Sequence, residues 1–297
     1  MTGLWNLIRR HCKLFFKDKG MFFTSLITPV ILLVLYVTFL GNVYRDSFVS
    51  ALPQGFSIPE KLIGGTVGGQ LLSSLLAVSC VTVSFCCNMI MVSDKVTGAR
   101  RDLTVSPVKK STLALSYYLS ALFSTLLVCL LALGAGCVYL AKVGWYLSVE
   151  DVLYMVLDIV LLVMFGTALS SILSVFMHSQ GQISAAGTVV SAGYGFICGA
   201  YMPISQFGSG LQKVLSFLPG TYGTGLIRNH ALRGVYAEME AQGFPAMVVE
   251  AIKDSIDCNL YFFDKAVPVS AMYWILGGSV AVLLGVYVLL NLLHKEG

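Results

Sequence analysis

Charged residues are scarce in this chain of 297 residues. Asp, Glu, Lys and Arg make up 11% of it, whereas a typical soluble domain has about 25%. Apolar residues make up 57%, and the mean hydropathy is +0.81. Because so apolar a chain cannot cover a water-facing surface, we expect a lipid bilayer to be its solvent. The shortage of polar stretches excludes a separate soluble domain of ordinary size.

Motifs for nucleotide binding and hydrolysis are also missing. No Gly-Lys dipeptide occurs, so the chain cannot contain the phosphate-binding loop GxxxxGK[ST]. The hydrolase signatures HExxH and GxSxG do not occur either. We therefore expect no ATP hydrolysis by this chain alone, no catalytic residue and no cofactor of its own.

The eight cysteines do not form a disulfide pattern. Six of them fall in apolar runs, where a free cysteine behaves as a small hydrophobic residue. Only Cys258 is expected outside the cell, which leaves it no external partner. Cys86 and Cys87 have no nearby His or second Cys pair at zinc spacing, so no metal site is predicted.

Long apolar runs dominate the rest of the chain and predict an all-α integral membrane protein. A bilayer core requires about 20 helical residues. Runs of this length or longer predict six membrane spans, at about 21–41, 62–92, 111–141, 152–176, 183–203 and 271–293. The second and third runs exceed the thickness of the hydrocarbon core, so they must tilt, break or project beyond it.

The distribution of Lys and Arg predicts the orientation. With the N-terminus inside, the inner segments hold eleven basic and four acidic residues, a net charge of +7. The outer segments hold eight basic and ten acidic residues, a net charge of −2. Since cytoplasmic loops carry the excess of basic residues, both termini are expected in the cytoplasm of a cell-membrane protein.

Two segments outside the spans are expected to be helical. Residues 1–20 have apolar and basic side chains on separate helical faces, which indicates an amphipathic helix in the inner interface. A plain basic flank is the alternative. Residues 204–270 are too interrupted by Gly and Pro for a span and predict short re-entrant helices on the outer side. Residues 245–257 then predict an external amphipathic helix.

Within the predicted spans, one acidic residue and four glycines are candidates for the transport pathway or a subunit interface. Asp158 is the only acid inside a span, and intramembrane carboxylates are costly and often functional. It either faces a polar path or bonds a polar side chain on another helix. Gly64, Gly65, Gly68 and Gly69 form two overlapping GxxxG patterns, which favour close helix packing. Local weakening of the helix is the alternative.

The segment 94–110, between the second and third spans, is the most informative part of the sequence. Seven charged residues, five of them basic, surround Gly98 in a short loop beside the membrane. Such a loop is where a soluble partner would bind. A second contact is possible at the short polar turn formed by His178, Gln180 and Gln182, although a simple turn explains it equally well.

This loop resembles the first cytoplasmic loop of type-2 ATP-binding-cassette (ABC) exporter permeases. The similarity is carried by a charged pair, a Gly, an acid-Leu pair and Ser-Pro-Val, which here are Asp94-Lys95, Gly98, Asp102-Leu103 and Ser106-Pro107-Val108. A second similarity is the external sequence Gly199-Ala200-Tyr201-Met202-Pro203, followed by Leu218-Pro219, Tyr222 and Leu226-Ile227-Arg228. The order of elements also matches over essentially the whole chain.

The resemblance implies that residues 97–108 form a coupling helix that docks in a groove of a separate ATP-binding subunit. Two ATPase subunits would bind ATP and Mg, and a second permease subunit would complete the exporter within membrane lipid. Arg100 and Arg101 are expected to pair with acids on the ATPase, or else only to anchor the loop at the membrane. No nucleic-acid partner is expected.

Two other classes of function are also compatible with the sequence. A membrane-embedded enzyme requires polar residues clustered at one depth, where the sequence offers only Asp158. A scaffold or sensor without transport activity does not explain the structured basic loop. The sequence does not select a substrate, because drugs, peptides, lipids, lipid-linked glycans and haem-related cargo are all compatible with it.

Overall fold

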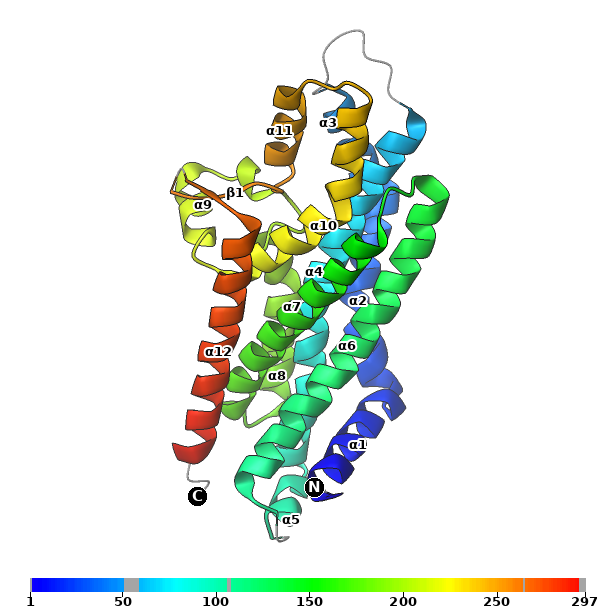
Figure 1. Ribbon diagram of the computed structural model, residues 1–297. Helices are drawn as coiled ribbons and strands as arrows, with labels where there is room; N and C mark the ends of the chain where they lie inside the picture. Colours follow the sequence, from blue (N-terminus) through cyan, green and yellow to red (C-terminus); the bar gives the residue numbers. More distant parts are fainter. Residues whose placement is uncertain (1, 51–58, 106–107, 264, 294–297) are drawn as a thin grey trace.

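The computed structural model describes residues 2–50, 59–105, 108–263 and 265–293, which form an elongated bundle of long helices (Figure 1). The elements, in chain order, are α1 (Thr2–Lys17), α2 (Lys19–Leu35), the π-helical turn η1 (Tyr36–Leu40), α3 (Gly41–Ser50), α4 (Glu60–Val96), α5 (Ala99–Val105), α6 (Lys110–Val143), α7 (Val149–Val175), α8 (Gln180–Ile197), the 3₁₀ turn η2 (Ile204–Gln206), α9 (Ser209–Leu215), α10 (Pro219–Ala241), α11 (Ala246–Ser255), β1 (Leu260–Phe262), β2 (Lys265–Val267) and α12 (Val269–Leu293).

The two ends of the bundle differ in their elements. Helices α1 and α5 and the final turns of α12 lie at one end, which we call the α5 end. Helices α3 and α11 lie at the opposite end, the α11 end (Figure 1). The start of α1 and the C-terminal end of α12 therefore lie at the same end of the molecule.

Local sequence signals set several helix starts. Asp18 caps α2 by accepting a hydrogen bond from the backbone N–H of Met21, at 3.0 Å. Ser148 and Asp151 form a reciprocal capping box at the start of α7. Ser179 caps α8 in the same way as Asp18 caps α2, by accepting from the N–H of Gln182. Each cap supplies a partner for a backbone donor that has none within the helix.

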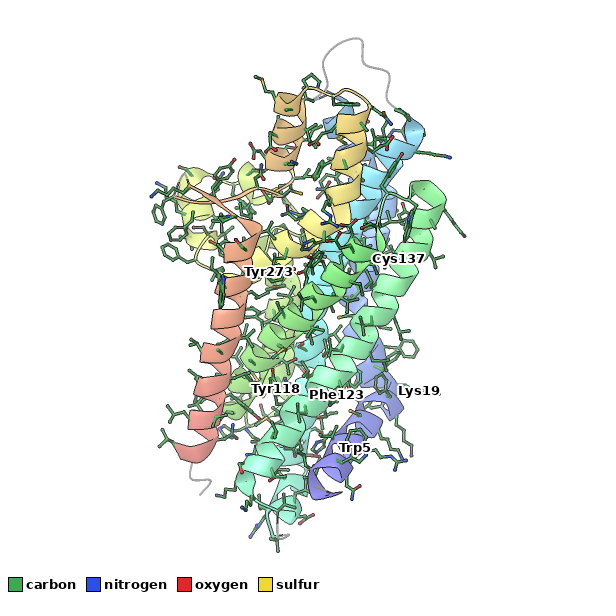
Figure 2. All side chains as sticks on the ribbon, viewed as in Figure 1. Trp5, Lys19, Tyr118, Phe123, Cys137 and Tyr273 are labelled. Carbon is green, nitrogen blue, oxygen red and sulfur yellow. The ribbon has the colours of Figure 1, made fainter. Side chains whose placement is uncertain are left out.

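Among the described residues, five helical stretches are long and apolar enough to cross a membrane: Lys19–Asp46, Glu60–Val96, Lys110–Val143, Val149–Val175 and Val269–Asn291. They correspond to five of the six predicted spans, and most extend beyond the predicted bounds. Helix α4 runs unbroken for 37 residues, so it accommodates its length without a break. Figure 2 shows Trp5 and Phe123 pointing away from the bundle, where 62% and 47% of their surfaces are exposed.

The predicted fifth span, residues 183–203, is the exception. Its helix, α8, begins at Gln180 and ends at Ile197, and it is not among the helices apolar enough to span. Gly199, with φ at +72°, turns the chain, and the N–H groups of Ala200 and Tyr201 both bond the carbonyl of Gly195. The helix therefore stops six residues before the predicted end, and a count of six spans is not confirmed.

Helix α4 lies at the centre of the bundle. It packs against α6, α7 and α10 on one side and against α2 and α8 on the other. The main core cluster joins α4, α6, α7, α10 and α12, and a second cluster fixes α1 against α4 and α6. The predicted amphipathic helix at residues 1–20 is thus α1, whose Phe15 is fully buried.

The segment after α8 is more varied than predicted. It contains the short helices α9 and α11 and the long helix α10, which packs between α4, α7 and α12. It also contains one antiparallel hairpin, in which Leu260 pairs with Val267, so the all-α prediction missed two short strands. The predicted helix at 245–257 is α11, which begins directly after Pro245.

Candidate functional site

The predicted coupling helix is present as α5, from Ala99 to Val105, and is shorter than the predicted 97–108. Gly98, with φ at +83°, provides the left-handed turn that separates it from α4. Arg101, Asp102 and Val105 are exposed, and Val105 has 83% of its surface accessible. Ser106 and Pro107 lie outside the described residues.

The other face of α5 is turned toward the bundle. Leu103 packs against the cluster that joins α1, α4 and α6, and Arg100 is half-buried. The predicted site residues therefore divide into two sets. Arg101 and Asp102 face solvent, together with Val105, which sequence reasoning did not single out. Arg100 and Leu103 face the protein.

Asp94 does not lie in a solvent-facing loop as predicted, because α4 continues to Val96. Its carboxylate is buried and accepts two hydrogen bonds from the Arg10 guanidinium, at 2.7 and 3.1 Å. The hydroxyl of Tyr117 donates a third, at 2.7 Å. A buried carboxylate with this set of donors is fully satisfied within the chain. Asp94 thus fastens α1 and α6 to the end of α4.

Lys95 is also engaged within the chain. Its ammonium group donates to the carbonyl oxygens of Ser174 and Val175 at 2.8 and 2.9 Å. These carbonyls belong to the last turn of α7, where a cation is favoured by the helix dipole. Lys95 therefore holds the end of α7 beside the end of α4.

His11 completes the cluster around Asp94. Its ring is fully buried and stacks on Tyr117 with 4.2 Å between ring centroids. Burial lowers the pKa of His11 to about 4, against the opposing pull of Asp94. The imidazole is therefore neutral at pH 7, and Arg10 supplies the counter-charge of Asp94.

The four glycines of the overlapping GxxxG patterns pack against other parts of the same chain. A Cβ at Gly64 would lie 2.6 Å from the carbonyl oxygen of Val143 at the end of α6. One at Gly69 would lie 2.6 Å from Leu232 of α10, and Gly65 and Gly68 are similarly close to Tyr146 and Leu140. The predicted close packing is present, but it is internal, so these glycines do not form a surface for another subunit.

Asp158 lies buried where α7, α10 and α12 meet. One carboxylate oxygen is 2.7 Å from Nδ1 of His230, and the other accepts from the Tyr273 hydroxyl at 2.6 Å. Tyr273 is on the part of α12 nearer the α11 end (Figure 2). Of the two alternatives for Asp158, a polar path or a polar side chain on another helix, the second describes its contacts. The sequence indicated the acid but not its two partners, which are distant along the chain.

Arg228 and Asp257 form a buried ion pair. The guanidinium of Arg228 is 1% exposed and donates to the carbonyls of Gly199 and Ile256, at 2.9 and 2.8 Å. It lies 3.8 Å from Asp257, whose carboxylate accepts from the backbone N–H groups of Ile204 and Ser205. Burial raises the pKa of Asp257, and Arg228 partly opposes this effect. Sequence reasoning named Arg228 only through the family resemblance.

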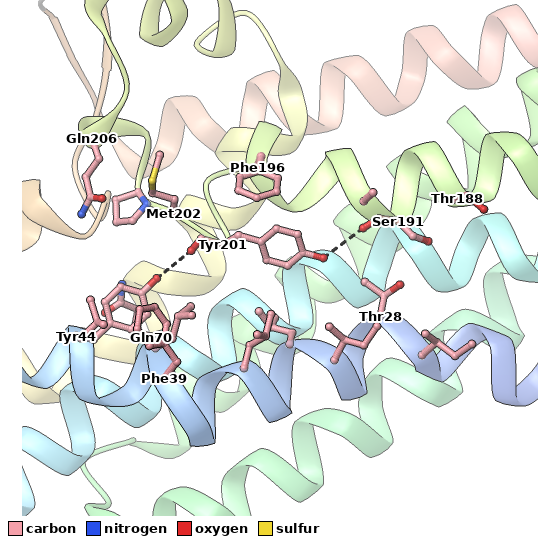
Figure 3. Close-up of a pocket in the computed structure, with 18 of the residues that line it drawn as sticks. Thr28, Phe39, Tyr44, Gln70, Thr188, Ser191, Phe196, Tyr201, Met202 and Gln206 are labelled. Atoms are coloured by element: carbon pink, nitrogen blue, oxygen red, sulfur yellow. Dashed lines mark hydrogen bonds between the residues drawn. The ribbon is translucent and has the colours of Figure 1, made fainter.

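A cavity of about 880 Å³ runs along the open side of α4 between α2 and α8. We call it the α2–α8 groove. Figure 3 shows Tyr201 within it, accepting a hydrogen bond from Tyr44 through its carbonyl and donating one to the carbonyl of Ser191, each 3.2 Å long. Thr28 of α2 lies across from Thr188 and Ser191 of α8 (Figure 3). Neither Asp158 nor the four glycines line this groove.

No group of three or more His, Cys, Asp or Glu suited to a metal ion occurs in the described part of the chain. All eight cysteines lie in that part and are free thiols.

Comparison with known proteins gives one family match. The model of the family described as ABC-2 type transporter matches residues 2–231, which is more than three quarters of the chain. No curated protein matched the chain. Since the match runs from α1 through the first half of α10 and includes both faces of the groove, the chain is a multi-pass membrane protein of the ABC-2 type transporter family.

Proposed function

We propose that this protein is the permease subunit of an ATP-driven exporter in the cell membrane, and that α5 receives the driving force from a separate ATPase. The observation that carries the proposal is the arrangement of α5. Its outer face presents Arg101, Asp102 and Val105, while its base is held by Asp94 and Lys95. Family membership supports a transport role without a catalytic site in this chain.

The connections at the base of α5 give a route for mechanical coupling. Asp94 joins α4 to α1 and α6, and Lys95 joins α4 to α7. A displacement of α5 would therefore act on four helices together, because short charge-assisted hydrogen bonds resist separation. Gly98 lets α5 turn away from the axis of α4, so that its face meets a soluble subunit at the membrane surface.

The membrane arrangement we propose has six spans, with α8 as the fifth and both termini in the cytoplasm. Helix α8 has 18 residues, or about 27 Å at 1.5 Å per residue, which is close to the hydrocarbon thickness. Helices α9 and α10 would form the re-entrant external segment, and α1 would lie in the inner interface. The basic excess near α1 and α5 supports this orientation.

A second permease subunit would cover the faces of α2 and α8. Exposed positions of α8 include Ser184, Ala185, Thr188 and Ala192, which are small or polar. Such a face gains little from lipid, whereas small residues allow another helix to approach closely. The α2–α8 groove would then be enclosed between two permeases, each paired with one ATPase subunit that binds ATP and Mg.

Co-purification with the ATPase tests the proposal. The chain is co-expressed with ATPase subunits encoded by neighbouring reading frames and is purified in detergent, as the original protein and as Arg101→Glu/Val105→Glu. We expect the ATPase to be retained by the original protein and lost from the double variant. The matched control is Glu240→Arg, a charge reversal at an exposed position in the last turn of α10, which should retain the ATPase.

Two results would reject the coupling role of α5. The first is that no ATPase accompanies the original protein. The second is that the double variant retains the ATPase and transports as well as the control.

A further inference from the structure

The described residues that line the α2–α8 groove are all uncharged. None of its lining residues in the described chain is Asp, Glu, Lys, Arg or His. Moving a charged group into so apolar a site without a counter-charge is strongly unfavourable. We infer that the cargo is an uncharged amphiphile, with an apolar body and one neutral polar group that accepts a hydrogen bond. This inference rests on the proposed transport function.

Gln70 of α4 is the observation that identifies the polar group. Its side chain lines the groove and is 2% exposed, and its Nε2 atom has no hydrogen-bond partner among the described residues. A buried amide donor without a partner costs about 1–3 kcal/mol. In Figure 3 Gln70 lies beside Tyr44 and Phe39, in the groove itself. An oxygen acceptor on a bound cargo would satisfy this donor.

The rest of the groove is suited to the apolar body. Its α2 wall contains Ile27, Ile31 and Leu35, and its α4 wall continues to Phe85 and Met89. From Gln70 to Met89 is 19 residues along α4, or about 28 Å. A volume of about 880 Å³ is within the usual range for sites that bind small organic molecules. These dimensions fit an elongated molecule with its polar group at Gln70.

The polar groups opposite α2 do not change this conclusion. Thr188 lies on α8 and bonds the carbonyl of Ser184 of its own helix, and the Tyr201 hydroxyl bonds Ser191. Both hydroxyls therefore already have an acceptor within the chain. Gln70 is distinguished from them because its donor group has none.

Three photoactivatable probes of equal chain length test the inference: a C16 alcohol, the matching fatty acid and the matching trimethylammonium. The original protein, in phosphatidylcholine nanodiscs, is labelled with each probe, and the modified residues are mapped by mass spectrometry. We expect the alcohol to label α2, α4 and α8 residues of the groove at least about fivefold more than either charged probe. The preference reflects the cost of placing a charge in an apolar site without a counter-charge.

Two variants separate binding in the groove from general contact with lipid. Gln70→Leu removes the donor at similar volume and should lower alcohol labelling about fivefold, with thermal stability unchanged or raised. Thr188→Trp fills the groove and should abolish the labelling there. Val282→Trp, at an exposed position of α12 away from the groove, is the matched control and should leave it unchanged.

The outcomes distinguish this inference from the proposed function. Equal labelling by all three probes, or a preference for a charged one, overturns the cargo class even if an ATPase co-purifies. Cross-links between two copies through α2 and α8 without any probe in the groove also overturn it. Labelling by the alcohol in a protein that binds no ATPase rejects the exporter proposal and leaves the groove assignment in place.

Discussion

The two sides of α4 differ sharply in how completely they are packed. Toward α7, Ser84 and Asn88 are hydrogen-bonded to Thr167 and Ser170, and the glycines fit against α6 and α10. Toward α2 and α8 lie an open groove and the unpartnered amide of Gln70. Buried polar groups are normally paired. We therefore infer that the side of α4 toward α7 maintains the fold, whereas the side toward α2 and α8 is available for binding.

Breaking the charge pair on the packed side should have the largest effect. Arg228→Met leaves the Asp257 carboxylate buried without its counter-charge, which should cost about 3–5 kcal/mol of stability. Thermal or denaturant unfolding in detergent measures it. Asp257→Asn in the same chain should restore part of the loss, because the uncompensated charge is removed.

The loss in Arg228→Met should also depend on pH. Burial raises the pKa of Asp257, so the folded protein binds a proton more readily than the unfolded chain, and stability falls as pH rises. Without Arg228 this pKa should rise further. The variant should therefore be closer to the original protein at pH 5 than at pH 8, and the opposite trend would contradict the pairing.

Adding one methyl group to the packed side should have the next largest effect. A Cβ at Gly234 would overlap the carbonyl oxygen of Tyr146, so Gly234→Ala must displace backbone. We expect a loss of about 3 kcal/mol, measured by unfolding. Gly277→Ala on α12 is the matched control, because no atom lies within 4 Å of its added Cβ. Equal stabilities would show that the packing is looser than described.

His11 provides a smaller test that depends on pH. Its pKa falls from an unfolded value near 6.5 to about 4, so its contribution is complete above pH 6.5 and is lost as pH falls toward 4. The loss should not exceed about 3.4 kcal/mol, which is 2.5 pKa units at 1.36 kcal/mol per unit. His11→Phe keeps the stacking on Tyr117 and should flatten the thermal stability profile between pH 6.5 and 4. An unchanged profile would place the titration elsewhere.

A substitution on the open side should have the smallest effect on stability and a large effect on transport. Ala192→Trp enters the groove from an exposed position of α8, so stability should change by less than about 0.5 kcal/mol. Transport should be lost because the groove is filled. The comparison fails if this variant unfolds the protein as Gly234→Ala does, since the open side would then be part of the fold.

The sequence predicted the helices better than their partners. Apolar run length located α2, α4, α6, α7 and α12, because the bilayer imposes that length directly. It overestimated α8, where Gly199 ends the helix, and it missed the hairpin of β1 and β2. The charge pattern predicted that Asp94 lies in the basic loop. Only the fold shows that Asp94 is buried and paired with Arg10, which is 84 residues away in the sequence.

The sequence also identified few of the candidate site residues, because it does not show which residues lie together in space. Asp158 was indicated by its rarity in a span, whereas His230 and Tyr273 carry no signal until three helices meet. Gln70 has none at all in the sequence, because an unpartnered amide is defined by what surrounds it. Glycine spacing predicted close packing and could not identify the neighbour, which is the same chain.

Photo-cross-linking from α5 tests the central claim most directly. A photoreactive amino acid is placed at Val105, whose side chain is 83% exposed, and in a matched chain at Glu240, in the last turn of α10. Both proteins are co-expressed with the ATPase and irradiated. Transfer of motion through α5 predicts an adduct between permease and ATPase from position 105 and none from position 240. An ATPase adduct from position 240, or none from 105 in a complex that transports, would contradict the account.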